Sequence, residues 1–220
     1  MNSQDCTHKT NILILIIMRI LELFSGTGSV GRVASELGFD VVSLDLKNAN
    51  INCDILEWDY TQYPSGFFDF IWASPPCTEY SIAKTMGVRK IEEANKIVMK
   101  TIEIIDYFQP TWWVIENPQT GYLKQQQFMQ GLGFVDVDYC KYGFSYRKRT
   151  RLWNNIKNWK CRPLCKKDCG SVVGGKHIET AQRLPSGKKR DWGDDYLIHK
   201  QSDLYKIPQE LISEIFENIT

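Results

Sequence analysis

The hydrophobic residues of the chain fall into short continuous runs that are separated by longer amphipathic stretches. Continuous apolar runs bounded by glycine or proline predict buried strands, and apolar residues that recur every three or four positions predict helices. The predicted strands span residues 19–24, 39–46, 67–74, 111–118, 134–139 and 150–154. The predicted helices span residues 30–37, 91–108, 124–132 and 205–219. This alternation predicts an α/β fold built on a doubly wound parallel sheet.

The pattern fades between residues 155 and 195, where lysine, arginine, glycine and cysteine replace the apolar runs. We therefore expect an N-terminal extension over 1–17, a main domain over 18–154, a short basic cysteine-rich insert over 155–202, and a C-terminal helix over 203–220 that returns to the main domain. No apolar run reaches the roughly 18–20 residues that cross a membrane. The first residues lack the basic leader and cleavage site of a signal peptide. We expect an intracellular protein without a membrane partner.

The net charge of +1 conceals an uneven distribution of charge. Residues 141–200 hold 16 of the 27 lysines and arginines but only 5 of the 26 acidic residues, which leaves 11 and 21 for the rest. A basic stretch in an otherwise acidic chain indicates a polyanionic partner such as nucleic acid, although a solvated surface would look the same. The odd number of cysteines, seven, argues against a disulfide framework.

A glycine-rich turn joins the first predicted strand to the first predicted helix. Gly26, Gly28 and Gly31 have the spacing G-x-G-x-x-G, which alone is compatible with a dinucleotide, S-adenosylmethionine or no ligand. Asp45 ends the next strand, where a carboxylate can bond ribose hydroxyls. Asp54 follows a further short apolar stretch, from which it could reach an adenine amino group. Each aspartate alone could be a simple strand-end cap, but together with the loop they favour a nucleoside ligand.

A cysteine follows two prolines just past the end of another predicted strand. Pro75 and Pro76 restrict the backbone, so Cys77 is held in place, either as a nucleophile or as an inert buried thiol. Glu116 also follows a strand, and the carboxyl ends of parallel strands share one edge of a sheet. A carboxyl group beside a thiol suits attack on a heteroaromatic ring whose nitrogen must gain a proton. Glu116 therefore favours the chemical interpretation.

Three arginines alternate in "YRKRTR". In an extended segment Arg147, Arg149 and Arg151 share one face, which could hold a pyrimidine carbonyl, a phosphate or another active-site anion. A solvated basic edge strand is the alternative.

These motifs, in this order, resemble those of DNA (cytosine-5) methyltransferases. The resemblance is carried by "FSGTGSVG", Asp45, "PPCTEYS", "ENP" and "RKRTR", and it covers roughly residues 19–153 and 203–219. The chain departs from the family pattern at Thr78 and Arg147, where the family usually has glutamine. Only about fifty residues separate Arg151 from Asp203. The chain thus resembles a minimal form with a very short target-recognition region, which leaves few side chains to read bases.

The resemblance implies a Rossmann-like S-adenosylmethionine-dependent methyltransferase fold and double-stranded DNA as the partner, as in restriction–modification. Cys77 would attack carbon 6 of a flipped cytosine, Glu116 would bond or protonate nitrogen 3, and Arg149 and Arg151 would orient the base. The cofactor-binding residues would be Phe24, Ser25, Gly26, Thr27, Gly28, Ser29, Val30, Asp45, Leu46, Asp54, Ile55 and Pro75. The DNA-binding residues would be Ser81, Arg147, Lys148, Arg162, Lys188, Lys189 and Arg190.

Two alternatives remain beside this function. One is the same chemistry on RNA, and the other is a non-catalytic nucleic-acid-binding subunit that needs a partner. The intact pair of Cys77 and Glu116 argues against the second.

The insert also contains a candidate zinc site. Cys161, Cys165, Cys169 and His177 offer three thiols and an imidazole, which suit a tetrahedral structural zinc, and Cys140 could replace one ligand. Free surface thiols are the alternative.

Overall fold

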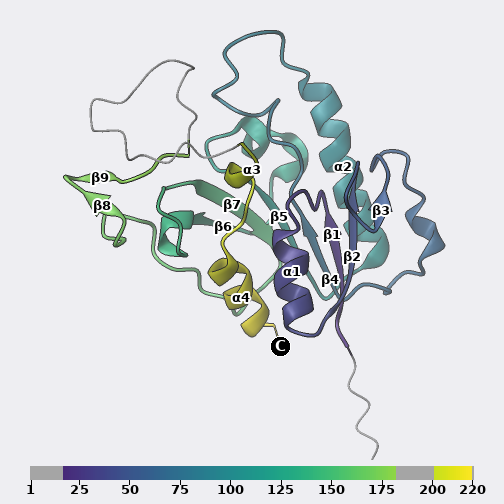
Figure 1. Cartoon of the computed structure of the whole chain (residues 1–220). Helices are drawn as coiled ribbons and strands as arrows, with labels where there is room; N and C mark the ends of the chain where they lie inside the picture. The colour runs from purple at the N-terminus through teal and green to yellow at the C-terminus, as the bar shows by residue number, and fades with distance from the viewer. Residues whose placement is uncertain (1–16, 182–200, 220) are drawn as a thin grey trace, which may run out of the picture.

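The computed structural model describes residues 17–181 and 201–219 and shows one central sheet with helices on both faces (Figure 1). Seven strands form the sheet in the order β3-β2-β1-β4-β5-β7-β6. The strands are β1 (Arg19–Leu23), β2 (Asp40–Asp45), β3 (Ile51–Asn52), β4 (Phe70–Ala73), β5 (Trp112–Pro118), β6 (Phe134–Asp138) and β7 (Arg149–Asn154). β1 to β5 pair in parallel, and β7 runs antiparallel between β5 and β6. The predicted doubly wound α/β fold is confirmed.

Two apolar cores cover the two faces of the sheet. On one face lie α1 (Ser29–Glu36) and α4 (Gln209–Glu217), and on the other lies α2 (Ile91–Phe108) (Figure 1). Phe216 of α4 packs edge-on against Phe39, with 5.4 Å between ring centroids, and against Phe70 of β4 at 5.2 Å. These contacts bring the end of the chain back to its first strands.

Two predicted helices differ from the structure. Residues 124–132 form no α-helix but two 3-10 turns, η2 (Tyr122–Gln125) and η3 (Gln127–Met129), because Gln126 between them has extended backbone angles of φ −71° and ψ 140°. The last helix begins only at Gln209, since Pro208 before it has ψ 131° and cannot continue a helical turn. Residues 205–207 are therefore outside the helix and lie beside the cavity described below.

The remaining elements are short. Two 3-10 turns, η1 (Tyr60–Gln62) and η4 (Tyr139–Lys141), lie in loops of the main domain, and α3 (Gln201–Leu204) precedes α4. The described part of the insert contains a small hairpin of β8 (Val172–Val173) and β9 (Lys176–His177). No helix in the described ranges is long and apolar enough to cross a membrane.

Candidate active site

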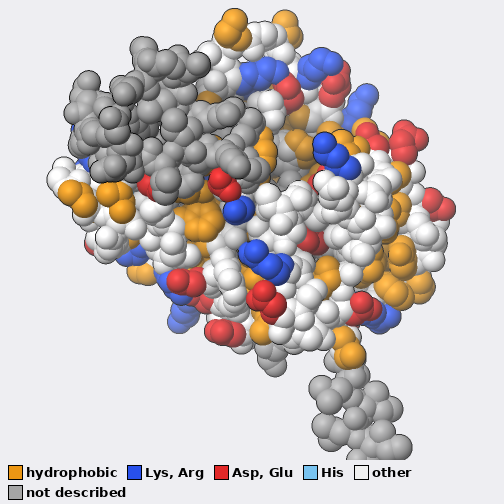
Figure 2. Space-filling view, viewed as in Figure 1, with side chains coloured by type: hydrophobic (Ala, Val, Ile, Leu, Met, Phe, Trp, Pro, Cys, Tyr) orange, Lys and Arg blue, Asp and Glu red, His pale blue; other side chains and the backbone are white. Residues whose placement is uncertain are grey.

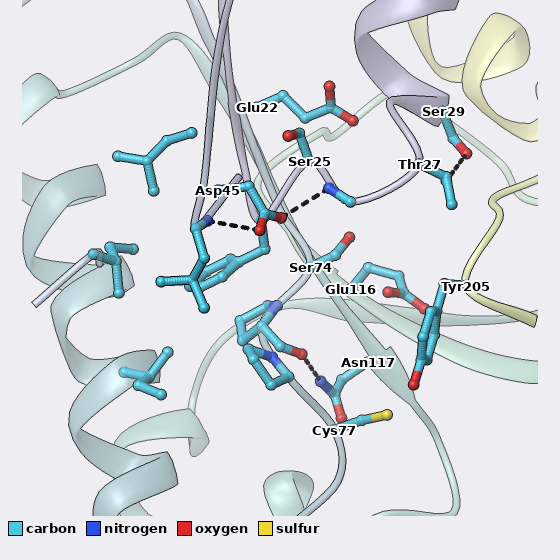
Figure 3. Close-up of a pocket in the computed structure, with 18 of the residues that line it drawn as sticks. Glu22, Ser25, Thr27, Ser29, Asp45, Ser74, Cys77, Glu116, Asn117 and Tyr205 are labelled. Atoms are coloured by element: carbon cyan, nitrogen blue, oxygen red, sulfur yellow. Dashed lines mark hydrogen bonds between the residues drawn. The ribbon is translucent and has the colours of Figure 1, made fainter. Parts of the chain in front are cut away.

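A cavity of about 330 Å³ opens at the carboxyl ends of the parallel strands, which is where open α/β sheets bind ligands. Its walls come from the carboxyl-terminal parts of β1, β2 and β5 and from the segments that follow β1 to β4, together with residues before β7 and before α4 (Figure 3). Ten of the predicted cofactor residues line it: Phe24, Ser25, Gly26, Thr27, Ser29, Asp45, Leu46, Asp54, Ile55 and Pro75. Gly28 and Val30 do not, because Gly28 forms the N-cap of α1 and the Val30 N–H points to Glu22.

Asp45 shapes the glycine loop from within. One oxygen of its carboxylate accepts a hydrogen bond from Gly26 N at 2.9 Å, and the other accepts one from Leu46 N at 2.7 Å (Figure 3). The loop turns through positive φ angles at Phe24 (59°) and Gly28 (63°). Such angles suit glycine but are uncommon for other residues, so the carboxylate helps to hold the loop in a strained shape at Phe24.

Glu22 is a cavity residue that the sequence analysis missed. Its side chain is only 3% exposed and accepts hydrogen bonds from Val30 N at 3.1 Å and Gly31 N at 3.0 Å, at the first turn of α1. Burial raises the pKa of Glu22 to about 7, the two backbone hydrogen bonds oppose that rise, and the charge of Asp45 adds to it. The signal was a single acidic residue inside the apolar run of residues 19–24.

Cys77 lies in the loop that follows β4, with its sulfur directed toward the cavity (Figure 3). The loop is fastened by Asn117 of β5, whose buried Nδ2 donates a hydrogen bond to the Pro75 carbonyl at 2.9 Å. Burial is the largest cause of a raised pKa for the Cys77 thiol. The carboxylate of Glu116 raises the pKa further, and the ammonium of Lys148 lowers it.

Glu116 comes to the cavity from β5 and is 6% exposed. Its Oε1 accepts a hydrogen bond of 3.1 Å from the hydroxyl of Tyr139, which follows β6, and lies 3.8 Å from Lys148 Nζ. Complete burial raises the pKa of Tyr139 well above its ordinary value, so this hydroxyl remains a donor. Tyr139 was not predicted from sequence, and Lys148 was predicted only as a DNA contact.

The structure does not bring Arg149 and Arg151 to the cavity, contrary to the prediction. Each forms a two-bond ion pair across the β6–β7 ladder, Arg149 with Asp138 and Arg151 with Asp136, at 2.7 to 2.9 Å. The reason is strand register. Glu116 lies opposite Leu152, so it shares a face with the residues that alternate with the two arginines. Lys148 also alternates with the two arginines along the strand, so its side chain lies on the same face as Glu116 and reaches it.

The structure places the predicted DNA-binding residues in different surroundings. Arg147 is exposed beside the start of β7. Ser81 Oγ accepts a hydrogen bond from Ala83 N within the loop after Cys77. The prediction for Arg162 is corrected. Its guanidinium forms ion pairs with Glu210 and Glu214 of α4 and lies over the Tyr142 ring, so a phosphate would have to displace these partners. Lys188, Lys189 and Arg190 lie outside the described residues.

The segment before α4 closes one side of the cavity. Tyr205 and Ile207 line it, and Ile207 N donates a hydrogen bond to Ser29 Oγ at 3.2 Å. Ser29 Oγ in turn lies 2.9 Å from Thr27 Oγ1 in the glycine loop (Figure 3). The C-terminal part of the chain thus contacts the predicted cofactor loop directly.

The predicted zinc ligands are also partly corrected. Cys165, Cys169 and His177 gather with Cys140, and the ligand atoms of these four residues all lie within 4.8 Å of one another. We call these four residues the Cys–His group. Cys161 is not among them, because its sulfur lies 3.9 Å from the Asp136 carbonyl and its side chain packs against the main apolar core.

Comparisons with known proteins show the family of the chain. A model of the family described as "C-5 cytosine-specific DNA methylase" matches residues 18–126. A protein of Frog virus 3 (isolate Goorha), described as "Probable DNA (cytosine-5)-methyltransferase", is 38% identical over 157 residues, which are 64% of this chain and 72% of the viral protein. The chain belongs to the C-5 cytosine-specific DNA methylase family. This family confirms the predicted enzyme class, which transfers a methyl group to cytosine in DNA with S-adenosylmethionine and a covalent cysteine intermediate.

One solved structure similar to this methylase is described as a "putative DNA modification methyltransferase encoded within prophage" from E. coli. It has a TM-score of 0.49 and 17% sequence identity, and the match covers 91% of this chain and 69% of that chain.

The cavity fits the cofactor of the family. Apolar walls at Phe24, Leu46 and Ile55 suit an adenine ring, and the carboxylates of Asp45 and Asp54 lie at successive strand ends that suit ribose and amino groups. The volume also lies in the range of small-molecule sites. Because Asp45 already accepts two backbone hydrogen bonds, only its remaining lone pairs are available to ribose.

Proposed function

We propose that this methylase modifies carbon 5 of cytosine in DNA, with Cys77 as the nucleophile and Glu116 as the group that bonds the ring. The observation that carries this proposal is the convergence of Cys77, Glu116 and Lys148 on one cavity, although they follow β4, end β5 and precede β7. A thiol, a carboxyl group and an ammonium group in one cavity are what addition to a pyrimidine requires.

S-adenosylmethionine, when bound, supplies an electrophilic methyl group. We propose that the glycine loop and the ends of β1 and β2 hold it, with Asp45 and Asp54 toward the adenosine. Tyr205 and Ile207, from the segment before α4, would close the cavity on the side of Ser29.

The protein's own groups then account for the reaction on the base. The target cytosine must leave the duplex stack, because ring carbon 6 is otherwise unreachable. The Cys77 thiolate adds to carbon 6, and Glu116 holds a proton at nitrogen 3, which offsets the charge that develops on the ring. Carbon 5 becomes nucleophilic and gains the methyl group. Loss of the carbon 5 proton then restores the double bond and releases Cys77.

Lys148 takes the place that the sequence analysis assigned to the arginines. Its ammonium lies 3.8 Å from Glu116 and lowers the pKa of Cys77, so it favours the thiolate. Arg149 and Arg151 act through structure, since their ion pairs fasten β6 to β7. That pairing holds Tyr139 and Lys148 at neighbouring ends of the two strands.

The direct test is a DNA duplex that contains 5-fluorocytosine. Fluorine cannot leave carbon 5 as a proton does, so the covalent protein–DNA adduct should persist and survive detergent electrophoresis. We expect an adduct from the wild-type protein with cofactor, none from Cys77→Ser, and a normal amount from Cys53→Ser, which removes another thiol that lines the cavity. An RNA duplex of the same sequence is the competing substrate. An adduct only with RNA would overturn the choice of DNA, and an adduct with Cys77→Ser would overturn the nucleophile.

We also propose that residues 155–202 act as a reduced target-recognition region and that the Cys–His group within and beside it binds a structural zinc ion. Three thiols and one imidazole form a common ligand set for structural zinc. The metal content of the purified protein, measured by mass spectrometry, should be one zinc ion per chain. A protein purified without any bound metal would contradict the zinc proposal but not the methyl transfer.

A further inference from the structure

The Cys–His group is not an isolated feature of the insert, because one of its four residues belongs to the main domain. Cys140 lies in η4, directly after Tyr139, the residue whose hydroxyl contacts Glu116. We infer that a metal ion at the Cys–His group joins the insert to η4 and thereby positions Tyr139 against Glu116. This inference rests on the zinc site proposed above and assigns that site a role in the active site.

The four side chains are already close to a metal-binding arrangement. His177 Nε2 lies 3.5 Å from Cys165 Sγ and 3.2 Å from Cys169 Sγ. Tetrahedral zinc, with Zn–S near 2.3 Å and Zn–N near 2.0 Å, places its nitrogen and sulfur ligands about 3.5 Å apart. The three cysteines are each at most 7% exposed, so the group is screened from solvent on the thiol side.

Backbone and charged contacts support the same four residues. Lys167 N donates a hydrogen bond to Cys165 Sγ at 3.3 Å, an arrangement that stabilises a coordinated thiolate. Asp138, one residue from Tyr139, accepts a hydrogen bond from Cys165 N at 2.9 Å. Lys141 forms an ion pair of 3.0 Å with Asp168. The insert therefore contacts the chain on both sides of Tyr139, at the end of β6 and at the end of η4.

Tyr139 relays this attachment to the active site. Its hydroxyl donates a hydrogen bond to Glu116, and its backbone N–H donates one to the Lys148 carbonyl at 3.1 Å. Both partners belong to the proposed catalytic group. A change that lets η4 move would therefore loosen the contacts of Tyr139 with both Glu116 and Lys148.

The part of the insert that follows Arg162 buries few side chains. Between residues 162 and 181 the buried residues are Cys165 and Cys169 alone, both of them proposed ligands. A segment with so little apolar burial gains its folding energy from a metal, as small metal-binding domains do. Coordination through Cys140 would therefore supply much of the attachment.

The chain offers a matched pair of variants to test this. Cys140→Ser removes a proposed ligand, and Cys161→Ser removes a neighbouring half-buried thiol that lies outside the group. Loss of a ligand should lower zinc affinity by at least tenfold. With cobalt in place of zinc, the thiolate-to-metal absorption should fall for Cys140→Ser and not for Cys161→Ser. Equal effects of the two substitutions, with metal bound, would overturn the ligand assignment.

Hydrogen exchange then separates positioning from mere metal binding. The Tyr139 amide, bonded to Lys148, should exchange at least tenfold faster in Cys140→Ser than in the wild type or in Cys161→Ser. Unchanged exchange in a protein that has lost its metal would overturn the positioning role while leaving the zinc site intact.

Methyl transfer provides the last arm of the test. We expect Tyr139→Phe and Cys140→Ser each to lower kcat by about tenfold, the worth of one hydrogen bond to a charged group, with the KM for S-adenosylmethionine changed less than twofold. Because both act through the same contact, the double variant should be no slower than either single variant. Multiplied losses in the double variant would overturn the inference. A wild-type protein with metal but no methyl transfer would instead overturn the proposed function.

Discussion

At the scale of single residues, the thiol of Cys77 lies under the influence of two opposite charges. Burial is the largest cause of the raised pKa of Cys77, Glu116 raises the pKa further, and Lys148 lowers it. Since the thiolate is the reactive form, the two neighbours should have opposite effects on the reactivity of the sulfur. The direction of each effect can be measured without DNA or cofactor.

We predict that Lys148→Met slows and Glu116→Gln speeds the alkylation of Cys77 by iodoacetamide at pH 7.5. Losing the ammonium raises the thiol pKa, losing the carboxylate lowers it, and one pKa unit changes the thiolate fraction up to tenfold. Mass spectrometry of the peptide that contains Cys77 measures the rate. Lys157→Met, at an exposed lysine, is the control and should leave the rate unchanged. Changes of the same sign for the two test variants would contradict the electrostatic account.

Glu22 gives a second residue-scale prediction, for stability against pH. The folded protein keeps a proton on Glu22 up to about pH 7, whereas the unfolded chain loses it near 4.5. The resulting stabilisation is complete below the unfolded pKa and is lost as pH rises through the folded one. Between pH 5 and 8 the wild type should therefore lose about 2.5 kcal/mol of unfolding free energy relative to Glu22→Gln.

Urea denaturation of both proteins at the two pH values measures that difference. Glu217→Gln, at an exposed residue of α4, should change with pH as the wild type does. If the difference between wild type and Glu22→Gln is the same at pH 5 and pH 8, the raised pKa is refuted.

At the scale of elements, α1 approaches β1 closely at Gly31, which has no side chain. A methyl group added at Gly31 would lie 2.6 Å from Glu22 Oε2 and 3.2 Å from a methyl carbon of Val41. The position is buried, and its backbone N–H already bonds the same carboxylate. A side chain there would force the Glu22 carboxylate to move, which would disturb its hydrogen bonds to α1.

We predict that Gly31→Ala destabilises the protein by about 1–3 kcal/mol, the usual cost of adding volume to a packed core. It should also weaken the binding of S-adenosylmethionine, because Glu22 and the glycine loop line one cavity. Chemical denaturation and calorimetric titration measure the two effects. Ser35→Ala, on the exposed side of the same helix, should be nearly neutral. Equal stability of the two variants would contradict the close contact.

The helices and strands also show which parts of the fold could be predicted from the sequence. Six of the seven strands of the sheet were predicted, because apolar residues recur through each of them. β3 was not predicted, because its two residues are too few to form such a pattern. Residues 124–132 were not, because a helical spacing of apolar residues does not reveal the extended backbone at Gln126. The final helix was predicted four residues early, because Pro208 alone does not distinguish the first turn of a helix from the residue before it.

Within the active site, the sequence predicted Cys77 and Glu116 but not their surroundings. Cys77 and Glu116 each lie at or after the carboxyl end of a parallel strand. They therefore lie at the same edge of the sheet whatever the register of the strands. The choice between Lys148 and the arginines on either side depends on the register of β7 against β5, which the sequence does not contain. Tyr139 was out of reach for the same reason, since it contacts a partner far away in the chain. Cys140 was predicted only as a residue that could replace one zinc ligand, and the structure places it in the Cys–His group.

At the scale of the whole molecule, the basic stretch divides between two edges of the sheet. Arg147 precedes β7 and lies at the cavity edge. Because β7 runs antiparallel, its last residue Asn154 pairs with Val114 near the start of β5, so Lys157 lies toward the opposite edge. Other basic residues of the stretch are bound to carboxylates, namely Lys141, Arg149, Arg151 and Arg162. On the face in Figure 2, described basic and acidic side chains are interspersed.

We therefore predict that Arg147 and Lys157, two basic residues of the same stretch, contribute differently to DNA binding. A side chain that neutralises one phosphate adds about 0.9 to the slope of log affinity against log salt concentration. Arg147→Gln should lower that slope by about this amount, because Arg147 is exposed at the edge where DNA must approach Cys77. Lys157→Gln, at a side chain that is also exposed, should leave the slope unchanged. Fluorescence anisotropy with a labelled duplex between 50 and 200 mM salt measures both slopes, conditions over which such contacts are resolved. Equal slopes for the two variants would mean that the whole stretch, and not the cavity edge, meets the DNA.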